Sequence, residues 1–123
     1  MTARGRLGDA GERLTERRLS ERGWQILDRK WRAAGGEIDL VALDGSVLVF
    51  VEVKTRRGNA RGAAEEAVGP AKAARLLRLG EEYLAAHPDL ADRLWRVDLV
   101  AITLDRAGAV ERVSHIESAV ESG

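Results

Sequence analysis

The sequence predicts an α/β fold in which a mixed sheet of about five strands is flanked by helices, in the order α-β-β-β-α-β-β. Two segments rich in Glu, Arg, Leu and Ala have the composition of helices, and five runs rich in Val, Ile and Leu have that of strands. No repeat and no linker-like tract divides the 123 residues, so we expect one domain over residues 1–123.

The first half of the chain predicts one helix and three strands. Gly23 is a common type of helix end, and Asp44-Gly45 is a strong hairpin signal. A two-residue turn at Asp44-Gly45 would pair Leu43 with Ser46. The expected bounds are residues 8–22 for the helix and 24–31, 36–43 and 46–54 for the strands.

The second half predicts one helix and two strands after a polar, basic loop. Pro70 suits the first turn of the helix and Pro88 suits its end. The expected bounds are 55–66 for the loop, 69–88 for the helix, 94–104 and 110–116 for the strands and 105–109 for the turn between them. We expect residues 117–123 to fray.

The composition is that of an ordinary soluble protein, with 45% hydrophobic and 33% charged residues and no cysteine. The longest apolar run, Val47 to Val51, is far shorter than the roughly 20 residues of a membrane helix. We therefore expect a cytoplasmic protein without disulfides, thiolate zinc sites or membrane contact. Residues 1–62 carry 13 Lys and Arg against 9 Asp and Glu. This positive excess suits an anionic partner such as nucleic acid, and arginine on the surfaces of helices explains it equally well.

Two charged residues, Glu52 and Lys54, interrupt the most apolar expected strand. Burying such groups costs several kcal/mol unless they are paired, solvated or bound to metal. Side chains alternate along a strand, so Phe50, Glu52 and Lys54 share one face. Only three of the 20 cationic residues are lysines, and Lys54 is one of them, with Lys30 and Lys72. Chemical selection of the compact ammonium and neutral drift both explain this choice.

The preceding strand carries acids that the hairpin brings to Glu52. Glu37, Asp39 and Val41 share a face by alternation. The expected turn sets Asp39 opposite Phe50 and Glu37 opposite Glu52, which makes Asp39 and Glu52 diagonal neighbours. A register shift of two residues would keep these faces, and a shift of one would reverse them.

Two carboxylates on one face repel unless one is protonated or a cation lies between them. A hard divalent ion such as Mg²⁺ resolves the repulsion of Asp39 and Glu52, and Lys54 beside it could orient or deprotonate a water or stabilise charge on a phosphate. A cross-strand ion pair on a solvated sheet face explains the same residues without catalysis.

The segments GEIDLVA and VFVEVKTR, at residues 36–42 and 49–56, resemble the YraN-like family of small bacterial proteins, regarded as predicted endonucleases. Looser matches are GDAGERLTERRLSERG, RVDLV and HIESAV. That family is similar to the restriction-endonuclease-like PD-(D/E)xK nucleases, and most of all to archaeal Holliday junction resolvases. The resemblance implies a restriction-endonuclease-like fold and a metal-dependent endonuclease that hydrolyses phosphodiester bonds of branched or structured DNA.

The resemblance also implies a catalytic set. By position it gives Glu12, Asp39 and Glu52 as acids that bind Mg²⁺ or Mn²⁺ and Lys54 as the lysine that assists the attacking water. Glu12 lies on the helix side that carries Thr15 and could instead be a solvent-facing glutamate.

Other positions leave alternatives open. Glu37 is a supporting acid or a ligand beside the metal, or an ion-pair partner of Arg32 or Arg56. Lys72 contacts substrate in the implied picture, or extends along apolar surface. Lys30 stands where the family leads us to expect asparagine. Asp98 beside Arg96 is expected to form a structural ion pair.

The expected phosphate contacts follow the acidic residues in the chain. They hold the nucleic-acid backbone without reading sequence and are Thr55, Arg56, Arg57, Arg61 and Lys72. A symmetric homodimer would suit a junction with two equivalent strands. The leading alternative is a nucleic-acid-binding accessory protein with little or no turnover, and a third is a protein-interaction domain with a fortuitous charge cluster.

Overall fold

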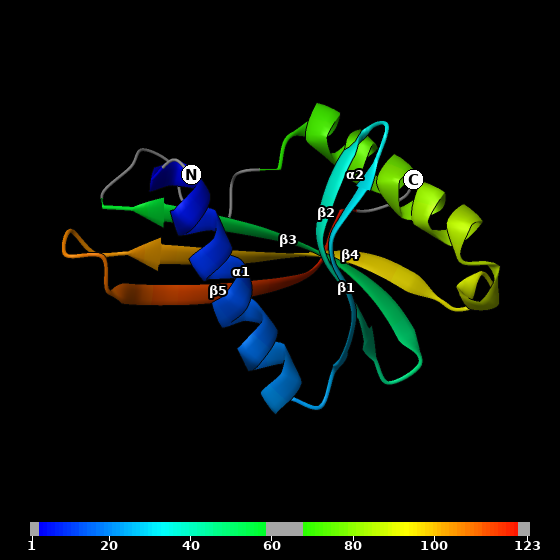
Figure 1. Cartoon of the computed structure of the whole chain (residues 1–123), viewed down its shortest axis with the longest axis horizontal. Helices are drawn as coiled ribbons and strands as arrows, with labels where there is room; N and C mark the ends of the chain where they lie inside the picture. The colour runs from blue at the N-terminus through cyan, green and yellow to red at the C-terminus, as the bar shows by residue number, and fades with distance from the viewer. Residues whose placement is uncertain (1–2, 59–67, 121–123) are drawn as a thin grey trace.

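The computed structural model describes residues 3–58 and 68–120 and contains one five-stranded sheet with a helix packed on each face (Figure 1). The elements in chain order are α1 (Ala3–Glu21), β1 (Gln25–Ala33), β2 (Gly36–Asp44), β3 (Val47–Arg57), α2 (Pro70–Ala86), the 3-10 helix η2 (Pro88–Leu90), β4 (Trp95–Leu104) and β5 (Val110–Val120). The predicted α/β class and order α-β-β-β-α-β-β are confirmed, and η2 was not predicted.

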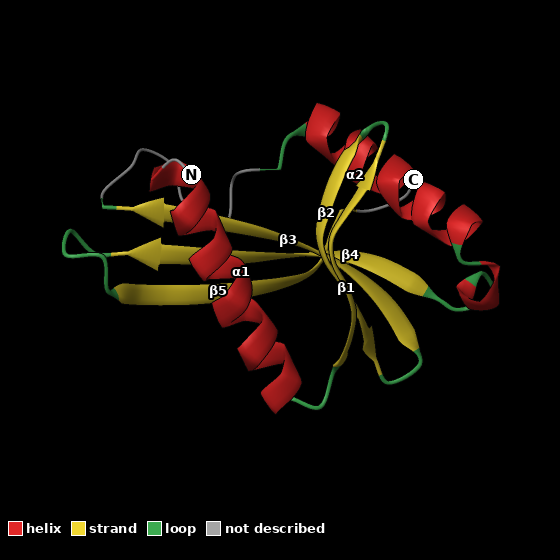
Figure 2. Cartoon of the chain, in the orientation of Figure 1, coloured by secondary structure: helices red, strands yellow, loops and turns green. Residues whose placement is uncertain are grey.

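The strands lie in the sheet in chain order, β1-β2-β3-β4-β5 (Figure 2). Neighbouring strands are antiparallel except β3 and β4, which are parallel and are connected through α2. A parallel pair requires such a crossover connection. Within the described residues, neither helix combines the length and the apolar character needed to cross a membrane.

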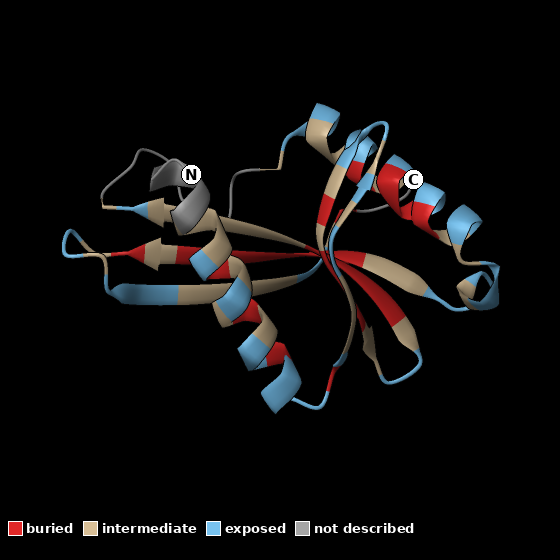
Figure 3. Ribbon diagram, in the orientation of Figure 1, coloured by how far each residue is buried: buried red, intermediate tan, exposed pale blue. Residues whose placement is uncertain are grey.

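Strand β3 is buried on both faces, which explains its unbroken apolar run. Figure 3 shows buried stretches in the strands and in both helices. Val49 and Val51 belong to a core cluster beneath α1, and Leu48 and Phe50 belong to a second cluster beneath α2. We call these the α1 core and the α2 core. Glu52 therefore follows directly on the most buried part of the sheet.

The hairpin register differs from the prediction by two residues. The turn residues are Gly45 and Ser46, and Asp44 pairs with Val47. Gly45 has φ +60°, a conformation that glycine adopts without strain and that the first position of a tight hairpin turn favours. Because a shift of two residues preserves the faces, the continued register moves Asp39 from a diagonal position to one directly opposite Glu52.

The end of β5 is ordered, and the expectation that residues 117–120 fray is wrong. Val120 pairs with Val97 and is 7% exposed. The register between β4 and β5 shifts near Ser118, whose φ is +51°. The Ser118 N–H donates to Asp98 Oδ1 at 3.0 Å, so a distant buried carboxylate stabilises a segment whose own sequence signals are weak.

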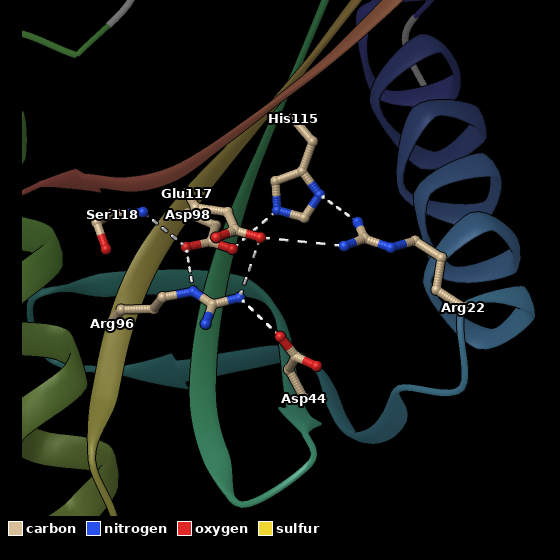
Figure 4. A network of polar contacts seen from close by, with 7 residues as sticks. All are labelled: Arg22, Asp44, Arg96, Asp98, His115, Glu117 and Ser118. Atoms are coloured by element: carbon tan, nitrogen blue, oxygen red, sulfur yellow. Dashed lines mark hydrogen bonds and ion pairs between the residues drawn. The ribbon is translucent and has the colours of Figure 1, made fainter.

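Asp98, on β4, is the centre of a polar network that connects β2, β4, β5 and the turn that follows α1 (Figure 4). Its carboxylate is fully buried and accepts hydrogen bonds from Arg96 Nε at 2.9 Å and from His115 Nε2 at 2.8 Å. Arg22 Nη1 lies 3.1 Å from His115 Nδ1. Because arginine can only donate, this contact suits the His115 tautomer in which Nδ1 accepts and Nε2 donates to Asp98.

The donors of this network satisfy the Asp98 carboxylate with three hydrogen bonds. Burial alone would raise the pKa of Asp98, but the hydrogen bonds from His115, Arg96 and the Ser118 N–H hold it below its usual range. The predicted ion pair of Arg96 and Asp98 is confirmed and is one part of a larger structural cluster. His115 and Asp98 therefore act in stability.

We expect Asp98→Asn to lower the free energy of unfolding by about 3 kcal/mol near pH 7, because removing one partner of a buried pair leaves the others uncompensated. The folded pKa of Asp98 is depressed, so its contribution is present above the unfolded pKa of about 4 and is lost as pH falls through the lower folded value. Urea denaturation at several pH values measures this, with exposed Asp92→Asn as the control. Equal stability of Asp98→Asn and wild type at pH 7 would contradict the network's role.

Candidate functional site

The carboxyls of Asp39 and Glu52 converge where strand pairing between β2 and β3 stops. The recorded pairs run from Asp44–Val47 to Leu40–Val51 and end one position before Asp39 and Glu52. Beyond that point the Val53 N–H donates to Asp39 Oδ2 at 2.8 Å. A side chain of β2 thus bonds the backbone of β3 at the row that holds the two acids.

Glu52 strongly affects the protonation of Asp39. The pKa of Asp39 is raised to about 8, first by burial, then by the charge of Glu52 and by a hydrogen bond shared with Glu52. The Val53 N–H and the charge of Glu12 have smaller effects, in opposite directions. Near neutral pH and without a cation, the pair Asp39 and Glu52 therefore retains a proton between its carboxyls.

Lys72 approaches the pair from α2. Its Nζ lies 2.5 Å from Glu52 Oε2, and the Lys72 and Glu52 side chains are 23% and 11% exposed. The contact excludes the alternative that Lys72 only extends along apolar surface. Lys54 is partly buried and shares the α2 side of β3 with Glu52 by strand alternation.

Glu12 lies on α1 and is held by Lys30. Lys30 Nζ lies 3.0 Å from Glu12 Oε1 and 2.8 Å from Asp9 Oδ1, so one ammonium bridges two acids of the helix. The Glu12 side chain is 15% exposed, which excludes a solvent-facing glutamate. Burial raises the pKa of Glu12, against the hydrogen bond and charge of Lys30, and the charge of Glu37 adds to the rise.

A cavity of about 200 Å³ borders Glu12, Asp9 and Lys30. Asp9 was missed by the sequence reasoning. Asp9 lies three residues before Glu12, and residues three apart on a helix share a face, so this spacing was the signal that could have indicated it.

Lys30 has a left-handed backbone in the middle of β1, with φ +49°. Arg29 already points to α1, where its guanidinium binds Glu16 at 2.6 Å, and alternation would turn Lys30 to the opposite side. The left-handed conformation instead directs Lys30 to α1 as well, and Trp31 packs on the α2 core. Such a backbone costs about 1–2 kcal/mol in a residue other than glycine, asparagine or aspartate.

Strand β2 shows the same break at Asp39. Leu40 lies in the α1 core, whereas Ile38, two residues earlier, lies with Val41 in the α2 core. The prediction that Glu37, Asp39 and Val41 share one face is therefore wrong for Glu37, which precedes the break. Continued register between β1 and β2 sets Lys30 opposite Asp39, so both strands change faces at one row.

The remaining predicted site residues lie at varying distances from this row. Glu37 forms an ion pair with Arg32 at 3.1 Å, which confirms that alternative. Its charge acts on Glu12, so a supporting role for Glu37 stays a prediction.

Of the predicted phosphate contacts, Lys72 lies at the acid pair and three others follow along β3. Thr55 Oγ1 is buried and faces Gly11 of α1, on the opposite side of β3 from Glu52, so its predicted role has no structural support. Arg56 shares the side of Glu52 by alternation, and its buried Nε has no hydrogen-bond partner within the described residues. Arg57 is exposed, and Arg61 lies outside the described residues.

The carboxylates of the predicted site are the type of ligand that a hard divalent cation prefers, but only two of them lie close together. Asp39 and Glu52 offer carboxylate oxygens, and a cation would relieve the repulsion that raises the pKa of Asp39. Across residues 3–58 and 68–120, however, no three acidic or histidine side chains are gathered closely enough to hold a metal ion. Of the three predicted acids, Asp39 and Glu52 lie together. Glu12 is close enough for its charge to affect Asp39 but is paired with Lys30.

Comparison with known proteins places the chain in a family. The family model of the uncharacterised protein family UPF0102 matches residues 11–102, which include the acids, Lys54 and Lys72. The chain belongs to UPF0102. UPF0102 is the YraN family, so the resemblance seen in the sequence is confirmed.

UPF0102 relatives match over nearly their whole length. A UPF0102 protein of Roseiflexus castenholzii is 48% identical over 118 residues, covering 96% of this chain and 95% of the relative. One of Kineococcus radiotolerans is 50% identical over 114 residues, covering 93% of each chain. One of Streptomyces griseus is 49% identical over 109 residues, covering 89% of this chain and 92% of the relative.

We expect Asp39→Asn to stabilise this UPF0102 protein at alkaline pH. The folded pKa of Asp39 is raised to about 8, so the wild type loses stability as pH rises from the unfolded pKa of about 4 through 8, and the amide variant does not. Above pH 8, the variant's free energy of unfolding should exceed that of wild type by roughly 1–3 kcal/mol. Urea denaturation in EDTA measures this, and parallel pH profiles of the two proteins would contradict it.

Substitution of Lys30 separates its backbone strain from its ion pairs. Lys30→Asn should stay within about 1 kcal/mol of wild-type stability, because asparagine tolerates φ +49° and the partly exposed ion pairs contribute little. Lys30→Val should be less stable than Lys30→Asn by roughly 2 kcal/mol, because a branched side chain opposes that backbone. In both variants, NMR titration should show the pKa of Glu12 higher than in wild type, since Lys30 lowers it. Equal stability of the two variants would show that φ is not strained.

Proposed function

We propose that this UPF0102 protein is a metal-dependent endonuclease that hydrolyses phosphodiester bonds of DNA, with branched or structured DNA as substrate. The observation that carries the proposal is the convergence of the Asp39 and Glu52 carboxyls in a partly buried position; burial and then the charge of Glu52 raise the pKa of Asp39 to about 8. A perturbed acid pair that opposes folding stability near neutral pH is typical of functional sites. The resemblance to the PD-(D/E)xK nucleases supports the same chemistry.

Asp39 and Glu52 would hold Mg²⁺ or Mn²⁺, with Glu12 as a third acid. The cation would supply a more acidic water and neutralise charge on the phosphate. Glu12 needs to be released from Lys30 or to bind through its second oxygen, because Oε1 is 3.0 Å from the ammonium.

Residues of the chain supply the rest of the chemistry. Lys54, beside Glu52 on β3, would orient the attacking water or stabilise the negative charge that develops on the phosphate. Arg56, one step further on the same side, and Lys72 would hold neighbouring phosphates of the backbone. The Val53 N–H fixes the Asp39 carboxylate at 2.8 Å, which keeps one acid in place while the other exchanges partners.

A second candidate is a nucleic-acid-binding accessory protein with little or no catalysis. Two ion pairs favour it, because Lys72 on Glu52 and Lys30 on Glu12 neutralise the acids without metal. Two such lysines stabilise the site in a state that needs no cation. The decisive difference between the candidates is whether DNA cleavage depends on a divalent ion and on Glu52.

We expect cleavage of flapped, gapped or four-way DNA with Mg²⁺ or Mn²⁺, and a reduction of about 100-fold or more in Glu52→Gln, because the variant removes a charged ligand at the reacting phosphate. A nuclease assay over linear and branched DNA with each metal measures both effects.

Glu81→Gln on the exposed side of α2 is the matched control and should cleave as wild type does. Salt-sensitive DNA binding without metal-dependent cleavage would favour the accessory protein. The homodimer stays a prediction, which sedimentation of the protein with and without a four-way junction tests.

A further inference from the structure

The contact between Lys72 and Glu52 couples helix α2 to the acid pair. The 2.5 Å distance from Lys72 Nζ to Glu52 Oε2 is that of a direct ion pair, and both side chains are mostly buried. An ion pair shielded from water is stronger than one on the surface. Glu52 therefore has a strong partner in the cation-free protein.

A divalent cation competes with Lys72 for Glu52. Mg²⁺ binds carboxylate oxygens at about 2.0–2.1 Å, and the ammonium already occupies one side of Oε2. The hydrogen bond between Asp39 and Glu52 engages the carboxyls further. A positive charge in this position also repels a cation at the second oxygen of Glu52. Full cation binding thus requires Lys72 to move.

Lys72 can move without disturbing the fold. It lies in the first turn of α2, whereas the residues that anchor the helix to the sheet, among them Leu76, Leu79 and Tyr83, follow one turn or more later. The flexible four-carbon stem of lysine swings the ammonium away from Glu52 while the helix stays in place. The released ammonium stays on the side of β3 that carries Lys54 and Arg56.

We propose that Lys72 is an exchangeable counter-ion: it neutralises Glu52 in the cation-free protein and passes to a phosphate of the nucleic acid when a divalent cation takes Glu52. This inference rests on the proposed metal-dependent function. The exchange makes cation and nucleic acid bind cooperatively, because each favours the arrangement in which Lys72 has left Glu52.

The first measurement is Mn²⁺ affinity without DNA, from the electron paramagnetic resonance signal of free Mn²⁺. Lys72→Met removes the competitor at nearly constant length and should bind Mn²⁺ about tenfold more tightly than wild type. Lys72→Arg keeps the charge and should bind Mn²⁺ no more tightly than wild type, because its guanidinium can hold Glu52 through two hydrogen bonds. Arg75→Met, which removes an exposed cation one turn along the same helix, should lie within about twofold of wild type.

The second measurement is affinity for a fluorescently labelled four-way junction with and without Ca²⁺, an oxygen-seeking cation used here as the probe. Ca²⁺ should strengthen DNA binding by wild type, and Lys72→Met should lose most of this increase. Mn²⁺ affinity in Lys72→Met equal to or weaker than that of wild type would overturn the exchange while leaving the nuclease proposal intact. Tighter Mn²⁺ binding in Lys72→Met without DNA cleavage by wild type would support the exchange and overturn the nuclease. Failure of both proteins to bind Mn²⁺ would overturn both.

Discussion

The structure around the candidate site depends on one repulsion, that between the carboxyls of Asp39 and Glu52. The most buried part of β3 lies directly before Glu52, so water cannot fully solvate the pair. Neighbouring elements reduce the cost in different ways. The Val53 N–H binds one carboxyl and Lys72 binds the other. Burial and the repulsion that remains raise the pKa of Asp39.

Two aspartates of the sheet, the buried Asp98 and the partly buried Asp39, differ in how their charge is compensated. Asp98 receives hydrogen bonds from Arg96, His115 and Ser118, and its pKa is lowered. Asp39 has a backbone donor and faces another acid, and its pKa is raised. A carboxylate that is saturated with donors stabilises the fold and has little left to offer a ligand. The poorly compensated carboxylate reduces stability at neutral pH and keeps its capacity for binding, which supports the role proposed for Asp39.

Sequence patterns predicted the features that depend on local periodicity and composition. They gave the order of the elements and the approach of Asp39 to Glu52. They missed the features that depend on contacts between distant segments. An Asp-Gly pair marks a hairpin without fixing which residues close the turn, so the register was wrong by two. Alternation is a local rule, and the left-handed Lys30 breaks it because α1 offers that side chain two acids.

The three lysines of this arginine-rich chain gain a physical explanation from their positions. Lys30 binds Glu12, Lys72 binds Glu52, and Lys54 follows Glu52 on the same side of β3. An arginine at these positions would hold a carboxylate through two parallel hydrogen bonds and keep its charge in a planar, rigid group. A lysine ammonium holds the same oxygen as a single mobile point charge, which can leave for another anion. Under the proposed exchange, a position that neutralises an acid in one state and releases it in another favours lysine, whereas the bond from Arg96 to Asp98 favours arginine.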